Sequence, residues 1–254
     1  MYVLVDYDNI PLKLKNLGVD IVIDSLADSL LNNAVAGDAA DRDLRFRLYG
    51  GWFNAEGSLS RNAQKLTGKV QGTFPKDREV VRIDGESNER IGRQTIHAEM
   101  AYTLLVDRNR QLHSTYRETK ETDFRIKCNN PSSVCKQTSC SLQNLHRFFD
   151  KKRCPDQACD VSVKDILEKE GQKLVDGMLM SDLIFLNENH EPSIVLASSD
   201  DDLWPAIIHV LVRGRSRLYH LRAISNDTHR RSAPAEGYVK GLRTHYYPLT
   251  LGAK

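Results

Sequence analysis

Short apolar runs near the two ends of the chain each stop at an acidic segment. The runs Tyr2–Val5 and Ile194–Ala197 have the length and composition of buried strands. Apolar residues recur at helical spacing over Val19–Val35, and again over the segment that carries Asp176 and Asp182. The pattern therefore predicts strands and helices that alternate at both ends of the chain.

The same pattern predicts several further elements and leaves two segments less defined. Leu44–Tyr49 alternates apolar and basic residues, which is typical of a strand with Arg45 and Arg47 on one face. Pro11–Gly18 is expected to form a loop, and Thr95–Val106 fits either a strand or a helix. Further strands are predicted at Glu79–Ile83, Arg217–Ala223 and Tyr246–Leu249, and further helices at Ser58–Val70 and Leu203–Val212.

This order of elements predicts an α/β fold with a doubly wound, mostly parallel sheet flanked by helices. A chain of 254 residues with 40% hydrophobic residues is long enough for one such domain over residues 1–254. The pattern loosens in the middle, where all five cysteines fall. Residues 86–165 are therefore interpreted as a cysteine-containing insertion.

Acidic residues stand where the strands end. In a parallel α/β sheet, ligands bind beyond the carboxyl ends of the strands, so Asp6 and Asp200 are expected to meet although far apart in sequence. Asp176 is expected in the first turn of its helix, where the helix dipole favours a negative charge. Mg²⁺ and Mn²⁺ prefer oxygen ligands, and Asp202 completes a candidate ligand set of four carboxylates.

Two further residues are predicted to support this set. Asn9 can hold Asp6 or a substrate phosphate through its amide. Asp182 lies six positions after Asp176, about 120° around the helix, so it is expected behind the ligands or at the edge of a channel. Simpler interpretations stay open, in which Asp202 caps the next helix, Asp8 and Asn9 shape a turn, and Asp182 faces solvent.

These residues resemble the NYN branch of the PIN-like metal-dependent ribonucleases. The resemblance rests on three blocks in the family's order: Asp6-x-x-Asn9, Lys173-x-x-Asp176 with Asp182 six residues on, and Ser198-x-Asp200-x-Asp202 followed by Pro205. Two positions depart from the family pattern, because Ser199 and Leu203 stand where Gly and Phe are usual. The resemblance implies a PIN-like fold and an endonuclease that hydrolyses phosphodiester bonds with Mg²⁺ or Mn²⁺, with RNA rather than DNA as the expected substrate. It assigns the site to Asp6, Asn9, Asp176, Asp182, Asp200 and Asp202.

Two other functions are compatible with parts of the sequence. Asp6 and Asp8 after a strand also resemble haloacid-dehalogenase-like phosphatases, in which the first Asp is the nucleophile and the second the acid/base. That scheme has no place for Asp176. A PIN-like module that binds nucleic acid or protein without catalysis is the third hypothesis.

The cysteines allow two interpretations. Cys135-x4-Cys140 and Cys154-x4-Cys159 form two pairs, with Cys128 and His146 as substitute ligands. Four such ligands can hold a structural Zn²⁺ in a tetrahedron. Free thiols are the alternative, because the spacing is wider than the usual two residues.

Charge is uneven along the chain. The formal net charge is only +2, but nine Lys or Arg stand against two acids from Leu203 to the end. Arg213, Arg215 and Arg217, with Arg45 and Arg47, are therefore candidates for binding a nucleic-acid backbone, unless they form an ordinary solvated surface. The sequence also lacks a signal-peptide pattern and a long apolar span, so a cytoplasmic protein without a membrane partner is expected.

Overall fold

The computed structural model describes residues 1–31, 43–54, 57–84, 88–112, 117–120, 141–156, 158–162, 169–172, 174–223 and 246–251. The chain divides into two compact units. One combines Met1–Tyr116 with Lys173–Lys254, and the other is Arg117–Gln172. The larger unit contains all the acidic residues predicted to form the site.

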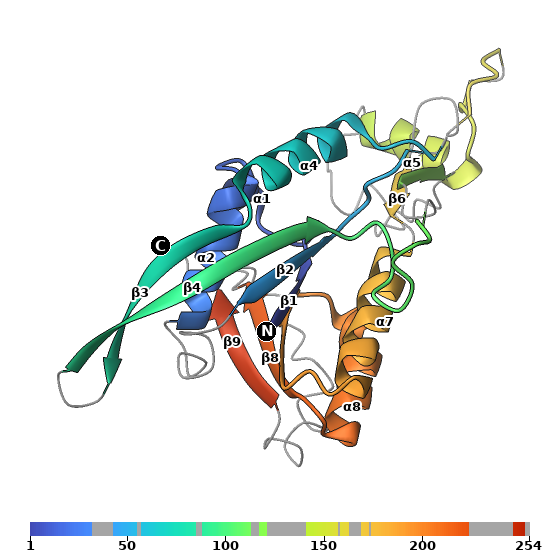
Figure 1. The fold of residues 1–254 in the computed structure, drawn as a ribbon. Coiled ribbons are helices and arrows are strands. Elements are labelled where there is room, and N and C mark those ends of the chain that lie inside the picture. The colour runs from blue at the N-terminus through green and yellow to red at the C-terminus, as the bar shows by residue number, and fades with distance from the viewer. Residues whose placement is uncertain are drawn as a thin grey trace. The chain divides into compact units, whose positions relative to one another are not determined.

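A seven-stranded sheet forms the centre of the larger unit (Figure 1). Its strand order is β3-β4-β2-β1-β7-β8-β9, and every neighbouring pair is parallel except β3 with β4. The strands are β1 (Tyr2–Asp6), β2 (Leu44–Tyr49), β3 (Lys76–Asp84), β4 (Asn88–Met100), β7 (Ser193–Ala197), β8 (Arg217–Ala223) and β9 (Tyr246–Leu251).

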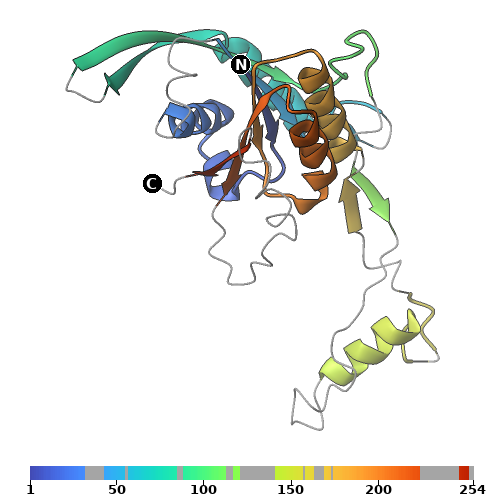
Figure 2. The same cartoon turned by 90° about the horizontal axis from the view of Figure 1, so that it is seen from below.

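Helices cover both faces of this sheet, with α2 and α4 on one side and α7 and α8 on the other (Figures 1 and 2). The helices of this unit are α1 (Leu12–Lys15), α2 (Val19–Leu31), α4 (Arg61–Thr73), α7 (Val175–Glu188) and α8 (Trp204–Arg213), and a 3-10 turn, η2 (Asp201–Leu203), precedes α8. The resulting arrangement is a three-layer α/β fold.

The alternation of side chains along each strand builds two hydrophobic cores. Val3 and Val5 pack in the core under α2 and α4, whereas Leu4 packs against α7 and α8. Because both faces of the central strands are covered, all five residues of β7 are buried. This explains why β1 and β7 appear in the sequence as continuous apolar runs rather than alternating ones.

The smaller unit consists of a strand pair and a helix. β5 (Arg117–Lys120) pairs antiparallel with β6 (Lys169–Gln172), so the two ends of this unit lie side by side. Between them lies α5 (Ser141–Lys151), in which the rings of Phe148 and Phe149 meet edge to face.

The predicted α/β class and mostly parallel sheet are confirmed, with three local corrections. Pro11–Gly18, expected to be a loop, contains the short helix α1. Thr95–Val106 is a strand as far as Met100. β4 also pairs with β2 in the main sheet, so the part of 86–165 before residue 113 belongs to the larger unit rather than to an insertion. Within the described residues, no helix is both long and apolar enough to cross a membrane.

Candidate metal centre

The topology opens a crevice at the carboxyl ends of β1 and β7. From β1 the chain passes through α2 to β2, and from β7 it passes through α8 to β8 on the opposite face of the sheet. The two connections therefore diverge between β1 and β7, which is where parallel α/β sheets bind their ligands. Asp6 ends β1, and Asp200 follows β7 after two serines.

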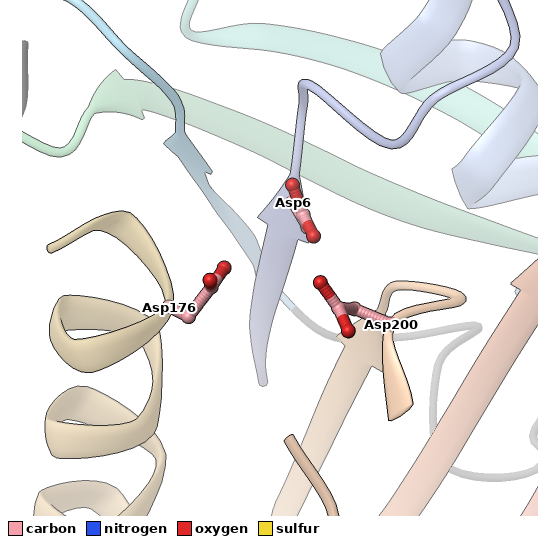
Figure 3. Close-up of side chains that lie close together, drawn as sticks. All are labelled: Asp6, Asp176 and Asp200. Carbon is pink, nitrogen blue, oxygen red and sulfur yellow. The ribbon is translucent and has the colours of Figure 1, made fainter. Parts of the chain in front are cut away.

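Three carboxylates converge in this crevice. Asp6, Asp176 and Asp200 each offer an oxygen atom, and these three atoms lie within 4.8 Å of one another. Figure 3 shows the side chains pointing toward one another from the end of β1, from the first turn of α7 and from the loop after β7. The predicted meeting of residues that lie almost at opposite ends of the sequence is confirmed.

Hydrogen bonds fix the buried Asp6 carboxylate. The side-chain amide of Asn9 and the hydroxyl of Ser198 both donate to Oδ2, the latter at 2.9 Å. The Ser198 hydroxyl also accepts from the Asp200 backbone N–H at 3.1 Å, so it links the loops after β1 and β7. Burial nevertheless raises the pKa of Asp6, and nearby Asp8 adds to this effect. The predicted role of Asn9 in holding Asp6 is confirmed.

Asp200 is held by the turn that starts after it. Its Oδ1 accepts a hydrogen bond of 2.9 Å from the backbone N–H of Asp202, which caps η2. The buried ring of His220 supports the loop between β7 and Asp200. Its Nε2 lies 3.1 Å from the carbonyl oxygen of Ser198. Since a carbonyl oxygen only accepts, this nitrogen carries the proton, and Nδ1 faces the Tyr246 hydroxyl at 2.9 Å.

Asp176 sits in the first turn of α7, as predicted. The helix begins after Leu174, whose backbone adopts a left-handed conformation with φ 62°. Partial burial, followed by the charges of Asp200, Asp6 and Asp202, raises the pKa of Asp176 to about 6. The carboxylates therefore repel one another, and the described residues do not neutralise them.

A hard divalent cation fits this donor set. Three carboxylate oxygens within 4.8 Å of one another can share one ion, and Mg²⁺ and Mn²⁺ take oxygen ligands and keep several waters. The raised pKa of Asp176 is the electrostatic signature of a site that lacks positive charge. Asp6, Asp176 and Asp200 are thus the residues that can hold the metal.

The other candidate acids lie outside the triad. Asp202 is exposed and contributes no oxygen to the group, although its charge acts on Asp176. It does not cap α8 either, because it belongs to η2. The carboxylate of Asp8 accepts from the backbone N–H of Gly51 at 2.9 Å, and Asp201 pairs with Arg222 at 2.8 Å.

The structure excludes a channel-edge or solvent-facing position for Asp182, because its side chain is fully buried, and of the predicted positions only the one behind the ligands is left. Its carboxylate accepts hydrogen bonds from Arg47 Nε at 3.0 Å, from the Tyr49 hydroxyl at 2.6 Å and from the Leu105 backbone N–H at 2.7 Å. Asp182 lies about 120° around α7 from Asp176, so its side chain faces the sheet and not the crevice.

The same contacts overturn the prediction that Arg47 binds a nucleic-acid backbone. It was expected on an exposed face, but its side chain is 2% exposed, and it also donates to Glu99 at 2.5 Å and to the Thr103 carbonyl oxygen. It is not available to a nucleic acid. Its neighbour on the face, Arg45, is exposed and lies over the Tyr2 ring at the amino end of the sheet.

The remaining predicted basic residues also lie away from the acids. Arg217 begins β8 and pairs with Ser193, at the amino ends of the strands. Arg213 and Arg215 precede it and form ion pairs with Glu188, at 3.8 and 2.5 Å. Four strand steps of about 3.3 Å separate this edge from the crevice. The sequence contains this information, because a residue that starts a parallel strand cannot lie where the strands end.

The zinc interpretation is only partly inside the described residues. Cys128, Cys135 and Cys140 lie outside them. Cys154 and Cys159 are free thiols, and among the described residues neither they nor His146 belong to a group with metal-binding geometry.

No known protein family matches the chain, and neither does a curated protein or a solved structure.

Proposed function

We propose that this protein is a metal-dependent nuclease that hydrolyses phosphodiester bonds with Mg²⁺ or Mn²⁺, and that its substrate is RNA. The observation that carries the proposal is the convergence of carboxylate oxygens from Asp6, Asp176 and Asp200 within 4.8 Å at the carboxyl edge of the sheet. A divalent ion held there supplies Lewis acidity to a phosphoryl oxygen and to the attacking water. The hydrolysis of a phosphodiester needs little other chemistry.

The residues around the triad have defined tasks in this scheme. Asn9 and Ser198 orient the Asp6 carboxylate, and Ser198 also ties it to the Asp200 loop. A cation held by the triad would lower the pKa of Asp176, since the positive charge would offset the repulsion that raises it, and the carboxylate would be ionised over a wider pH range. A substrate phosphate can then approach from solvent over the half-exposed Asp176 and Asp200.

The resemblance to the NYN branch of PIN-like ribonucleases supports the choice of nuclease and of RNA. Asp6, Asn9, Asp176 and Asp200 stand at the family's positions and lie in the centre. Asp182 stands at a family position but is used inside the protein, which is a departure from the role that the resemblance implies. We propose a PIN-like identity for the fold on these four residues.

A cleavage assay on mixed RNA and DNA, with each divalent metal, tests the proposal. Asp200→Asn should abolish cleavage without unfolding the protein, because Asn is as good a helix cap as Asp and keeps the acceptor for the Asp202 N–H. Asp202→Asn is the matched control and should retain most activity. Unchanged cleavage by the Asp200 variant would refute the assignment.

The two other hypotheses predict different results. A haloacid-dehalogenase-like phosphatase requires Asp8 as its acid/base, but the Asp8 carboxylate is engaged by Gly51 while Asp176 occupies the crevice. Hydrolysis of p-nitrophenyl phosphate that is lost in Asp8→Asn would favour that hypothesis. Metal binding without cleavage of any nucleic acid would favour a non-catalytic binding module.

A further inference from the structure

Two cations stand on either side of the acidic triad at the carboxyl edge of the sheet. We infer that Lys15 and Arg222 bind the phosphodiester backbone of the nucleic acid on the two flanks of the metal centre. The inference rests on the proposed function and adds the surface along which the substrate lies. Lys15 and Arg222 take the role that the sequence analysis gave to Arg213, Arg215 and Arg217 with Arg45 and Arg47.

Arg222 flanks the β7 side of the centre. It stands near the end of β8, and its Nη2 donates to the Ser199 carbonyl oxygen at 3.1 Å and to Asp201 Oδ1 at 2.8 Å. Both acceptors are sequence neighbours of Asp200. These two bonds use only Nη2, so the N–H groups of Nη1 and Nε remain to donate single hydrogen bonds to phosphate oxygens. The side chain is 32% exposed, so a ligand can reach it.

Lys15 flanks the β1 side. Its Nζ donates to the Asp8 carbonyl oxygen at 3.0 Å and lies 5.6 Å from the centroid of the Tyr7 ring. Asp8 is two residues beyond Asp6, and consecutive Cα atoms are about 3.8 Å apart. Each cation is therefore bonded to a carbonyl oxygen one or two residues away from a carboxylate of the triad.

Contacts of this kind are expected not to read sequence. Phosphate groups are the same along every strand, so two cations that bind them position the nucleic acid without distinguishing its bases.

The carboxylates make this binding depend on metal. Without a divalent ion, Asp6, Asp176 and Asp200 repel a phosphate more strongly than two tethered cations attract it. With the ion, most of the negative charge of the three carboxylates is cancelled, and the ion can itself take a phosphate oxygen as a ligand, so the contacts of Lys15 and Arg222 are no longer outweighed. Oligonucleotide binding should therefore appear only when Mn²⁺ is present.

Charge-matched variants test the inference. The probe is a short single-stranded RNA with hydrolysis-resistant phosphorothioate links, and binding is followed by fluorescence anisotropy with Mn²⁺ over a range of salt. Lys15→Gln and Arg222→Gln should each weaken binding by on the order of five-fold and flatten the salt slope by about 0.7, the value for one lost contact with a single strand. A DNA probe of the same length should lose affinity in parallel if only phosphates are bound.

Two paired variants remove the same charge from the same elements. Lys13→Gln lies on α1 beside Lys15, and Arg217→Gln lies at the other end of β8 from Arg222. Both residues are exposed, and both variants should bind like wild type. Equal losses in all four variants would mean a diffuse charge effect, and a loss in Arg217→Gln alone would restore the predicted arginine cluster. Either result would overturn the inference.

Failure of the inference can be told apart from failure of the proposed function. If wild type cleaves RNA but Lys15→Gln and Arg222→Gln bind normally, the inference fails and the nuclease stands. If wild type cleaves nothing but binds the probe in a way that depends on these two residues, the binding surface stands without the activity. The Mn²⁺-induced rise in Tm should be the same in all four variants, which shows that the metal centre is intact.

Discussion

At the scale of single residues, the centre is defined by negative charge that the protein itself does not balance. Asp6 is buried, and its raised pKa reflects the lost hydration of its charged form. Asp176 is pushed further, to about 6, by its neighbours as well. Such a cluster costs folding free energy at neutral pH, which the binding of a cation returns.

Asp176→Asn should stabilise the metal-free protein at neutral pH. The pKa of Asp176 is raised from 3.8 to about 6, so the folded state binds this proton more tightly than the unfolded state does. Its contribution is favourable at low pH and is lost as pH rises through 6. After allowance for solvent screening, the variant should gain on the order of 1 kcal/mol at pH 7.

Thermal melts in chelator over pH 4 to 8 measure this effect. The variant should melt about 2–4 °C above wild type at pH 7, and the two curves should converge toward pH 4. Added Mn²⁺ should raise the Tm of wild type only. A variant that is less stable than wild type at pH 7 would contradict the electrostatic account.

Some residues of the centre could be predicted from the sequence, and others could not. Asp6 and Asp200 follow recognisable apolar strands, so their meeting follows from the fold class alone. Arg47 and Asp182 form their ion pair across 135 positions, and nothing local marks either residue as buried. His220 and Lys15 were not predicted near the centre, because each contacts a backbone carbonyl, which no side-chain pattern reveals.

At the scale of elements, α7 carries Asp176, one of the three candidate metal ligands, and must keep its rotation against the sheet. Asp182 receives three hydrogen bonds, two from β2 and one from the segment after β4. β2 in turn pairs with β1, so that Tyr49 lies opposite Asp6. The buried pair thus connects the helix that presents Asp176 to the strand that presents Asp6.

Removal of one member of this pair should be more harmful than removal of both. Asp182→Leu leaves the Arg47 guanidinium buried beside an apolar group and should cost about 3–5 kcal/mol. Addition of Arg47→Met should recover part of that loss, because it removes the buried charge, whereas the Tyr49 hydroxyl and the Leu105 N–H still lack Asp182. Urea unfolding measures both values.

The surface pair of Glu188 with Arg215 provides the comparison for that experiment. Both side chains are about one-third exposed, so Glu188→Gln should cost less than about 1 kcal/mol. A cost for Asp182→Leu no greater than that for Glu188→Gln would contradict the role assigned to the buried pair.

Elements were predicted best where burial is complete. β7 was predicted to within one residue at each end because a strand covered on both faces is apolar throughout. In β2 the alternation LRFRLY predicted an exposed basic face, but the face toward α7 is covered and Arg47 is buried with its partner. Alternation fixes which residues share a face, whereas burial depends on the helix that packs there.

At the scale of the whole molecule, the candidate metal centre belongs entirely to the larger unit. Asp6, Asp176 and Asp200 all lie within Met1–Tyr116 and Lys173–Lys254. The smaller unit begins and ends in the paired strands β5 and β6, where Arg117 lies opposite Gln172. Its ends are therefore close enough for a short connection to replace it.

Replacement of residues 117–172 by a short Gly-Ser linker should leave the centre intact. The larger unit has its own sheet and both hydrophobic cores, and closure of a short loop costs little entropy. Circular dichroism and melts with and without Mn²⁺ check this. Loss of the Mn²⁺-induced rise in Tm, with the fold retained, would show that the smaller unit contributes to the site.

The measurement that tests the account most directly is calorimetric titration of the purified, metal-free protein with Mn²⁺, in parallel with Asp200→Asn. The account predicts saturable binding to wild type, with release of protons near pH 6 as Asp176 ionises, and binding weakened at least ten-fold in the variant. Absence of binding to wild type, or equal binding by both proteins, would contradict the claim that Asp6, Asp176 and Asp200 form a metal centre.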